Sequence, residues 1–127
     1  MQIISRRVHG VLDYLVGLSL IASPRLLQLD PGPESTVLVA FGGAAIAYSL
    51  VTRYELGLLK LLPFRAHLGL DTLHGFGLAA APWLFGFSGR VWVPHVVFGL
   101  LELGVILLTR RAEEAAPPPS ARPAVRP

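Results

Sequence analysis

The sequence predicts an all-α membrane protein in which four transmembrane helices form two parallel two-helix repeats related by a pseudo-two-fold axis. The first observation is composition: 53% of the 127 residues are hydrophobic and 15% are charged, with a mean hydropathy of +0.59. A soluble domain of this length could not bury so much apolar surface. The others are an internal duplication and four apolar stretches, each near the ~17 to 25 residues of a spanning helix.

The two halves of the chain repeat the same residue patterns. The pattern H-x3-D-x3-G-x6-P recurs at an offset of 58, as His9, Asp13, Gly17 and Pro24 and as His67, Asp71, Gly75 and Pro82. A second pattern, F-G-x9-T-R, recurs at an offset of 57, as Phe41, Gly42, Thr52 and Arg53 and as Phe98, Gly99, Thr109 and Arg110. Residues kept in both halves are expected to be architectural, and residues added to one half are where function is best sought.

The predicted helices follow the apolar stretches, because a helix satisfies its own backbone groups inside hydrocarbon. They cover 8–29, 36–51, 66–87 and 91–109. The first could be mistaken for a signal peptide, but Asp13 interrupts it and the segment recurs as the third stretch, so we expect it to be retained. The predicted domains are a first repeat, an interfacial cytoplasmic linker, a second repeat and a disordered Ala/Pro/Arg tail, at 1–55, 56–65, 66–111 and 112–127.

Basic residues are distributed unevenly between the two predicted membrane surfaces. Of the 11 lysines and arginines, only Arg25 and Arg90 lie on the side opposite to both termini. The positive-inside rule therefore predicts that both termini are cytoplasmic, with Trp83 and Trp92 at the outer interface. The net charge of +3 then reflects membrane topology and anionic headgroups, and no nucleic-acid partner is expected.

Two tripeptides at equivalent places suggest a family. Ser23-Pro24-Arg25 and Ala81-Pro82-Trp83 resemble the Ser-Pro-Trp signature of the SPW-repeat membrane proteins, a bacterial group with this signature in the first of two helices per repeat. The two-helix unit covers about residues 8–110; Arg replaces Trp in the first copy and Ala replaces Ser in the second. The resemblance implies an integral protein of the bacterial inner membrane, and it carries over no catalytic residue.

A polar stripe is predicted on the first helix and again on the third, because residues four apart share a helix face. The stripes consist of His9, Asp13 and Gly17, and of His67, Asp71 and Gly75. Small residues allow close approach, so we expect these helices to cross near Gly17 and Gly75, with Gly42 and Gly99 as further packing glycines. The stripe would line a polar cleft on the cytoplasmic side, serving structural hydrogen bonds, a ligand or ion site, or proton handling.

Three ionisable residues break the symmetry between the halves. His74, His95 and Glu102 stand where the first half has Val16, Leu38 and Ala45. At ~1.5 Å per residue, His74 and Glu102 lie at about the same depth and are predicted to form a buried pair. A candidate metal set of nitrogen and oxygen ligands, suited to zinc, manganese or iron, consists of His67, Asp71, His74 and Glu102.

The predicted function is a non-enzymatic membrane scaffold or binding protein with a polar His/Asp/Glu site on its cytoplasmic half. No serine has a nucleophile's setting, and no glycine-rich phosphate loop follows a strand. The expected partners are the lipid bilayer and either further copies of the chain or a membrane complex of which it is an accessory subunit. The ligand or proton site is assigned to His9, Asp13, His67, Asp71, His74, Glu102 and His95.

Two alternatives stay open. One is a proton or cation conductor or transporter, with a ladder of His67, Asp71, His74, Glu102 and His95. The other is a redox accessory subunit holding a metal or a haem, the haem lying between His9 and His67. Close glycine packing between those helices argues against haem, so the sequence leaves the cofactor open between a divalent metal and the less favoured haem. The absence of cysteine from the sequence excludes thiolate metal sites, disulfides and c-type haem.

Overall fold

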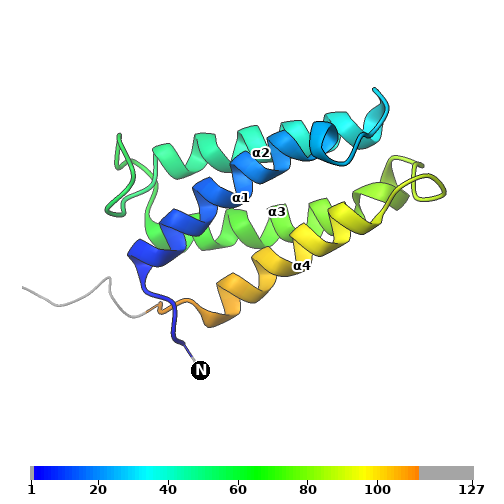
Figure 1. The fold of residues 1–127 in the computed structure, drawn as a ribbon. Helices are drawn as coiled ribbons and strands as arrows, with labels where there is room; N and C mark the ends of the chain where they lie inside the picture. Colours follow the sequence, from blue (N-terminus) through cyan, green and yellow to red (C-terminus); the bar gives the residue numbers. More distant parts are fainter. Residues whose placement is uncertain (1, 112–127) are drawn as a thin grey trace, which may run out of the picture.

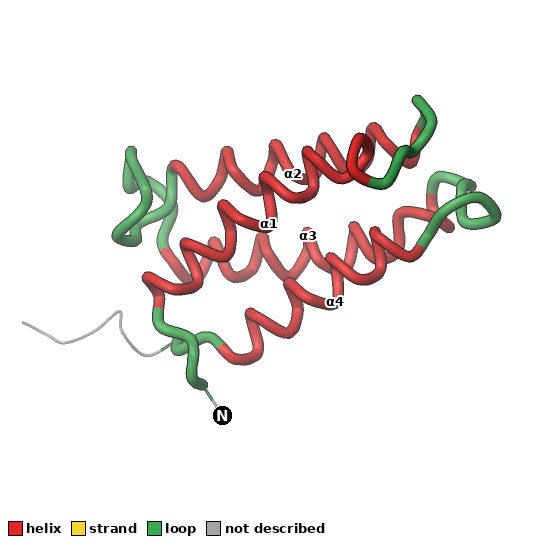
Figure 2. The backbone as a smooth tube through the Cα atoms, viewed as in Figure 1, coloured by secondary structure: helices red, strands yellow, loops and turns green. Residues whose placement is uncertain are grey.

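The chain folds into a bundle of four α-helices in a computed structural model that describes residues 2–111 (Figure 1). The helices are α1 (Arg6–Leu26), α2 (Pro33–Leu50), α3 (Phe64–Leu84) and α4 (Val93–Leu108). Loops join them at the two ends of the bundle, as Figure 2 shows, and the described part of the chain contains two isolated β-bridges but no strand. The predicted disordered tail, 112–127, lies outside the described residues.

Local sequence explains where the helices begin. The Ser5 side chain caps α1 by accepting a hydrogen bond from the backbone N–H of Val8 at 3.3 Å. Pro33 and Pro94 occupy the first turns of α2 and α4, where their missing N–H leaves no helical bond unmade. Pro63 precedes α3 in an extended conformation, directly before the helix begins at Phe64.

The helices pack mainly within each repeat, α1 against α2 and α3 against α4. A Cβ atom on Gly17 would lie 3.1 Å from the carbonyl oxygen of Gly42, and one on Gly75 would lie 3.0 Å from that of Gly99. The predicted crossing of the first and third helices at Gly17 and Gly75 is therefore wrong. Each glycine meets the other helix of its own hairpin, and the two stripe-bearing helices approach through their polar side chains instead.

Two apolar clusters hold the repeats together. One contains Leu20, Leu38 and Leu78 and lies toward the α1–α2 and α3–α4 loops. The other contains Tyr54 and Phe64 and lies toward the chain termini. Large apolar side chains also cover the outside of the bundle, and their exposed fractions include 58% for Leu18, 72% for Leu73 and 70% for Leu107.

The predicted fold class is confirmed in its coarser part, four helices forming an all-helical structure over the described residues. Among these residues, no helix has both the length and the apolar character that a membrane crossing needs. The linker between the repeats is not helical: backbone hydrogen bonds and the Thr52–Leu62 bridge fold it back, leaving Leu58, Leu59 and Leu61 exposed.

Candidate functional site

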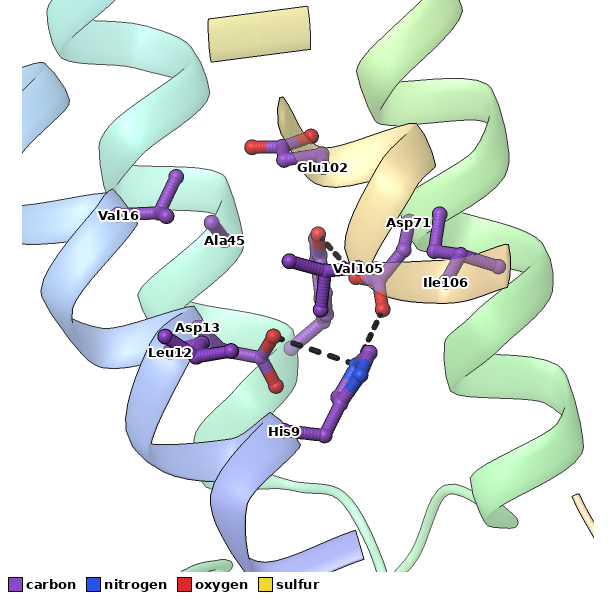
Figure 3. Close-up of a pocket in the computed structure, with 10 residues that line it drawn as sticks. His9, Leu12, Asp13, Val16, Ala45, Asp71, Glu102, Val105 and Ile106 are labelled. Atoms are coloured by element: carbon purple, nitrogen blue, oxygen red, sulfur yellow. Dashed lines mark hydrogen bonds and ion pairs between the residues drawn. The ribbon is translucent and has the colours of Figure 1, made fainter. Parts of the chain in front are cut away.

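Four side chains from the two polar stripes meet at the centre of the bundle, near the end that holds the termini. We call His9 and Asp13 of α1 with His67 and Asp71 of α3 the His/Asp box. His9 Nε2 lies 2.9 Å from Asp71 Oδ2 and 3.3 Å from Asp13 Oδ1 (Figure 3). His67 Nε2 lies 3.0 Å from Asp13 Oδ2 and 3.1 Å from Asp71 Oδ2. Each imidazole therefore contacts one carboxylate from each repeat.

Two threonines contact the imidazoles on the side opposite to the carboxylates. His9 Nδ1 lies 2.8 Å from Thr109 Oγ1, and His67 Nδ1 lies 2.8 Å from Thr52 Oγ1. Each hydroxyl donates its own proton to the carbonyl oxygen four residues earlier, at 2.7 Å. The threonine oxygens must therefore accept from Nδ1–H, which leaves both Nε2 atoms facing the carboxylates. Both contacts cross between repeats, so the box joins the two halves.

Two tyrosines complete the hydrogen bonds of the carboxylates. The Tyr48 hydroxyl donates to Asp71 Oδ1 at 2.7 Å, and the Tyr54 hydroxyl donates to Asp13 Oδ2 at 3.2 Å. The ring of Phe64 stacks on His67 with centroids 5.9 Å apart. These neighbours and the helices bury the box. The exposed side-chain fractions are 1% for His9, 0% for His67, 11% for Asp13 and 7% for Asp71.

The sequence reading missed four of these partners. The sequence could have pointed to Thr52 and Thr109, because both recur in the second repeated pattern. It did not point to Tyr48 and Tyr54, because the equivalent positions of the second half hold other residues. Only the folded arrangement shows that their hydroxyls reach the box.

The predicted pair of His74 and Glu102 is present. His74 Nδ1 lies 2.6 Å from Glu102 Oε2, and His74 Nε2–H donates to the backbone oxygen of Phe41 at 2.8 Å. Both ring nitrogens are therefore occupied. The potential metal-binding atoms that the structure gathers within 4.8 Å of one another belong to the His/Asp box instead. His74 and Glu102 of the predicted metal set are replaced there by His9 and Asp13.

His95 lies apart from the other predicted site residues. Its Nε2–H donates to the backbone oxygen of Glu34 at 3.0 Å, near the start of α2. Along α4, His95 is about 20 Å from Thr109 at 1.5 Å per residue. Arg90 binds the Glu34 carboxylate through two hydrogen bonds of 3.1 and 2.9 Å, which hold the pKa of that carboxyl below its usual value. The predicted ladder thus lacks a link between His95 and Glu102.

A small cavity adjoins the box (Figure 3); most of the residues that line it belong to α1 and α4, and Ala45, Tyr48 and Asp71 belong to α2 and α3. Its volume is about 20 Å³, which is enough for roughly one water molecule. Its polar lining consists of His9, Asp13, Tyr48, Asp71 and Glu102.

The family is decided by a sequence comparison. The family model described as the SPW repeat domain matches residues 7–109, which is most of the chain. The chain belongs to the SPW-repeat family. No curated protein and no solved structure shows significant similarity to it. The resemblance noted from the two Pro-centred tripeptides is confirmed.

The donors of this SPW-repeat protein fit a small divalent metal ion. Neighbouring ligand atoms lie about 3.3 to 3.6 Å apart in a tetrahedral site with bonds of about 2.0 to 2.2 Å. The four nitrogen–oxygen contacts of the box, 2.9 to 3.3 Å, are at or slightly below that edge length, and all the candidate ligand atoms lie within 4.8 Å of one another. Imidazole nitrogen and carboxylate oxygen suit zinc, manganese or iron. A metal would be held by His9, Asp13, His67 and Asp71.

A haem held between His9 and His67 does not fit this arrangement. The two imidazole centroids are only 5.5 Å apart and the ring planes meet at 73°. Both Nε2 atoms, which would bind the iron, face the carboxylates of Asp13 and Asp71. These carboxylates occupy the space that a porphyrin would need between its two axial ligands.

Proposed function

We propose that this SPW-repeat protein is a non-enzymatic integral membrane protein that binds one divalent metal ion in the His/Asp box. The observation that carries the proposal is the threonine pair. Because Thr52 and Thr109 accept hydrogen bonds from the Nδ1–H groups, both Nε2 atoms face two buried carboxylates. Metal-binding histidines have this same arrangement, in which a second neighbour fixes the tautomer and orients the ring.

The charge of the box supports the same proposal. Two carboxylates with no more than 11% of their side chains exposed require neutralisation, since an uncompensated buried charge is strongly unfavourable. The available countercharges are protons on the two Nε2 atoms or one divalent cation. Metal binding would replace the protons by the cation. The affinity for the metal should therefore rise with pH as the ligands lose their protons.

Metal content measured on the full chain tests this function. The protein is purified in detergent, stripped with a chelator and titrated with Mn²⁺, Fe²⁺ and Zn²⁺, with bound metal counted by elemental analysis. We expect one equivalent in the wild type and loss of binding in Asp13→Asn and Asp71→Asn. Asp30→Asn, the same change at an exposed position, should keep it. Wild-type protein that binds none of the three metals would contradict the proposal.

The membrane location is part of the proposal, in the bacterial inner membrane with both termini cytoplasmic. It is supported by exposed large apolar side chains on all four helices, which are mainly leucines on α1, α3 and α4 and Val39 on α2, and by the unequal distribution of arginine and lysine. A reporter fused at Gly32 should be active outside the cytoplasm, and one fused after Arg111 should be active inside. A cytoplasmic signal at Gly32 would overturn this topology. In the membrane we expect further copies of the chain or a larger complex as partners.

A proton or cation conductor remains the second candidate. The observation that favours it is the cavity, because Glu102 of the His74 pair and Asp71 of the box line the same space. The two polar groups are thus close enough to exchange an ion through one water-sized site. Proton flux into liposomes measures this activity. His74→Leu combined with Glu102→Leu should keep the fold and abolish the flux; unchanged flux in the folded double variant would exclude this route.

A further inference from the structure

The two repeats surround the His/Asp box unequally. The pseudo-two-fold axis exchanges α2 with α4 and α3 with α1, so the α2–α3 side corresponds to the α4–α1 side. On the first side, Tyr48 fills the interface and its hydroxyl donates to Asp71 at 2.7 Å. The equivalent residue on the second side is Val105, which is too short to reach Asp13 in the same way. Most residues that line the cavity of about 20 Å³ belong to that side, four of them to α1 and three to α4.

Backbone and side chains obstruct other approaches to the box. At the end of the bundle, backbone hydrogen bonds of 2.8 and 2.9 Å tie Ile3 and Ile4 to the oxygen of Leu108. The loop after α2 brings Tyr54, which is 2% exposed, over Asp13. On the α2–α3 side the ring of Tyr48 packs against that of His67, with the centroids 5.2 Å apart. Among the described residues this leaves the α1–α4 cavity as the path with the smallest obstruction.

A third carboxylate stands in this path. Glu102 replaces the alanine of the first repeat and lines the cavity together with Asp13 and Asp71. Its side chain is 11% exposed, as is that of Asp13, while the two histidines of the box are almost fully covered. His74 fixes Glu102 by a contact of 2.6 Å, and the Phe41 backbone fixes His74 in turn. Both carboxylates therefore lie nearer the surface than the imidazoles do.

We infer that the α1–α4 cavity is the access route of the metal ion, and that Glu102 is an outer binding position that takes the ion before Asp13 and Asp71 do. This inference rests on the proposed metal site. A carboxylate oxygen of Glu102 would replace one water of the hydrated divalent cation, and the ion would then pass to the box, where the imidazole nitrogens would become ligands as the Nε2 protons and further waters leave to solvent. His74 is a positioning residue in this scheme, because both of its nitrogens are occupied by other groups.

The rate of metal loading tests the route separately from affinity. Stripped full-length protein in detergent is mixed with Co²⁺ in a stopped-flow instrument, and the visible absorption of the forming site is followed. Val105→Tyr places the side chain of the first repeat in the cavity and should slow loading about tenfold or more. Val97→Tyr, the same change at a 55% exposed position of α4, is the matched control and should load at the wild-type rate.

Two further variants cover the case in which Val105→Tyr does not fold. Glu102→Gln should slow loading by about tenfold and weaken its dependence on salt, because the attracting charge is lost. Val105→Ala, which widens the cavity, should load at least as fast as the wild type. The metal stoichiometry should stay at one in each variant that folds.

The outcomes separate this inference from the proposed function. If the wild type binds Co²⁺ and the Val105→Tyr and Val97→Tyr proteins load equally fast, the access route is wrong and the metal site stands. Equal rates for Glu102→Gln and the wild type exclude the outer position. If the wild type binds no divalent metal under any condition, the proposed function fails first, and the access route fails with it.

Discussion

At the scale of single residues, Thr52 and Thr109 fix the tautomer and the orientation of His67 and His9. Each threonine lies just after the second helix of its hairpin, and its hydrogen bond to Nδ1 orients an imidazole toward the carboxylates. The i, i+4 spacing of His9 and Asp13 was enough to predict one stripe. It could not predict that His9 pairs with Asp71 as well, because sequence spacing describes one helix and the contact joins two.

The contribution of Thr109 can be measured with a change that keeps its shape. Thr109→Val removes the acceptor of His9 Nδ1–H and leaves a buried donor unpaired, which costs about 1 to 3 kcal/mol of stability. Metal affinity should fall about 10- to 100-fold, as for other groups behind a metal ligand. Thr109→Ser should restore both, and Thr36→Val, at an exposed position, should change neither. Thermal unfolding and metal titration in detergent provide the two readouts.

At the scale of helices, each repeat is a hairpin closed by a pair of glycines. The duplication identified all four packing glycines, but the predicted contact between the helices of Gly17 and Gly75 is wrong, because these residues face Gly42 and Gly99. Internal repetition shows which positions are equivalent; it does not show which equivalent positions touch. The chain neighbour is the nearest partner for a helix that ends in a short loop, and α1 meets α2 for that reason.

Glycine substitutions distinguish the contacting positions from their neighbours. A Cβ atom on Gly42 would lie 2.6 Å from the carbonyl oxygen of Gly17, so Gly42→Ala must push the helices of the hairpin apart. We expect a loss of about 1 to 3 kcal/mol, the usual range for overpacking. Gly43→Ala is the control, since nothing lies within 4 Å of its Cβ position. It should be neutral or stabilising by up to about 1 kcal/mol, because alanine favours the helix. Equal effects of the two changes on the unfolding temperature would contradict this packing.

At the scale of the whole molecule, the two repeats are fastened to each other at both ends. The His/Asp box joins them near the termini, and Arg90 of the second repeat binds Glu34 of the first at the opposite end. Neither connection could be predicted from one repeat alone. The predicted membrane topology places the box on the cytoplasmic half and the Glu34–Arg90 pair outside. Variants of Glu34 and Arg90 leave the box unchanged, so their comparison with the wild type in acid isolates the outer connection.

The pH dependence of unfolding tests the outer connection. The hydrogen bonds from Arg90 lower the pKa of Glu34 below its usual 4.5, so the ionised carboxylate contributes stability above that pH. This contribution is lost as the pH falls through the lower pKa of the folded state. The unfolding temperature of the wild type should decline below pH 4.5. This decline should be smaller, and by the same amount, in Glu34→Gln and in Arg90→Gln. The opposite outcome is that Arg90→Gln shows the full wild-type decline in unfolding temperature and Glu34→Gln does not. In that case the Arg90 guanidinium is not what stabilises the Glu34 carboxylate, and its partner would have to be sought elsewhere on α2.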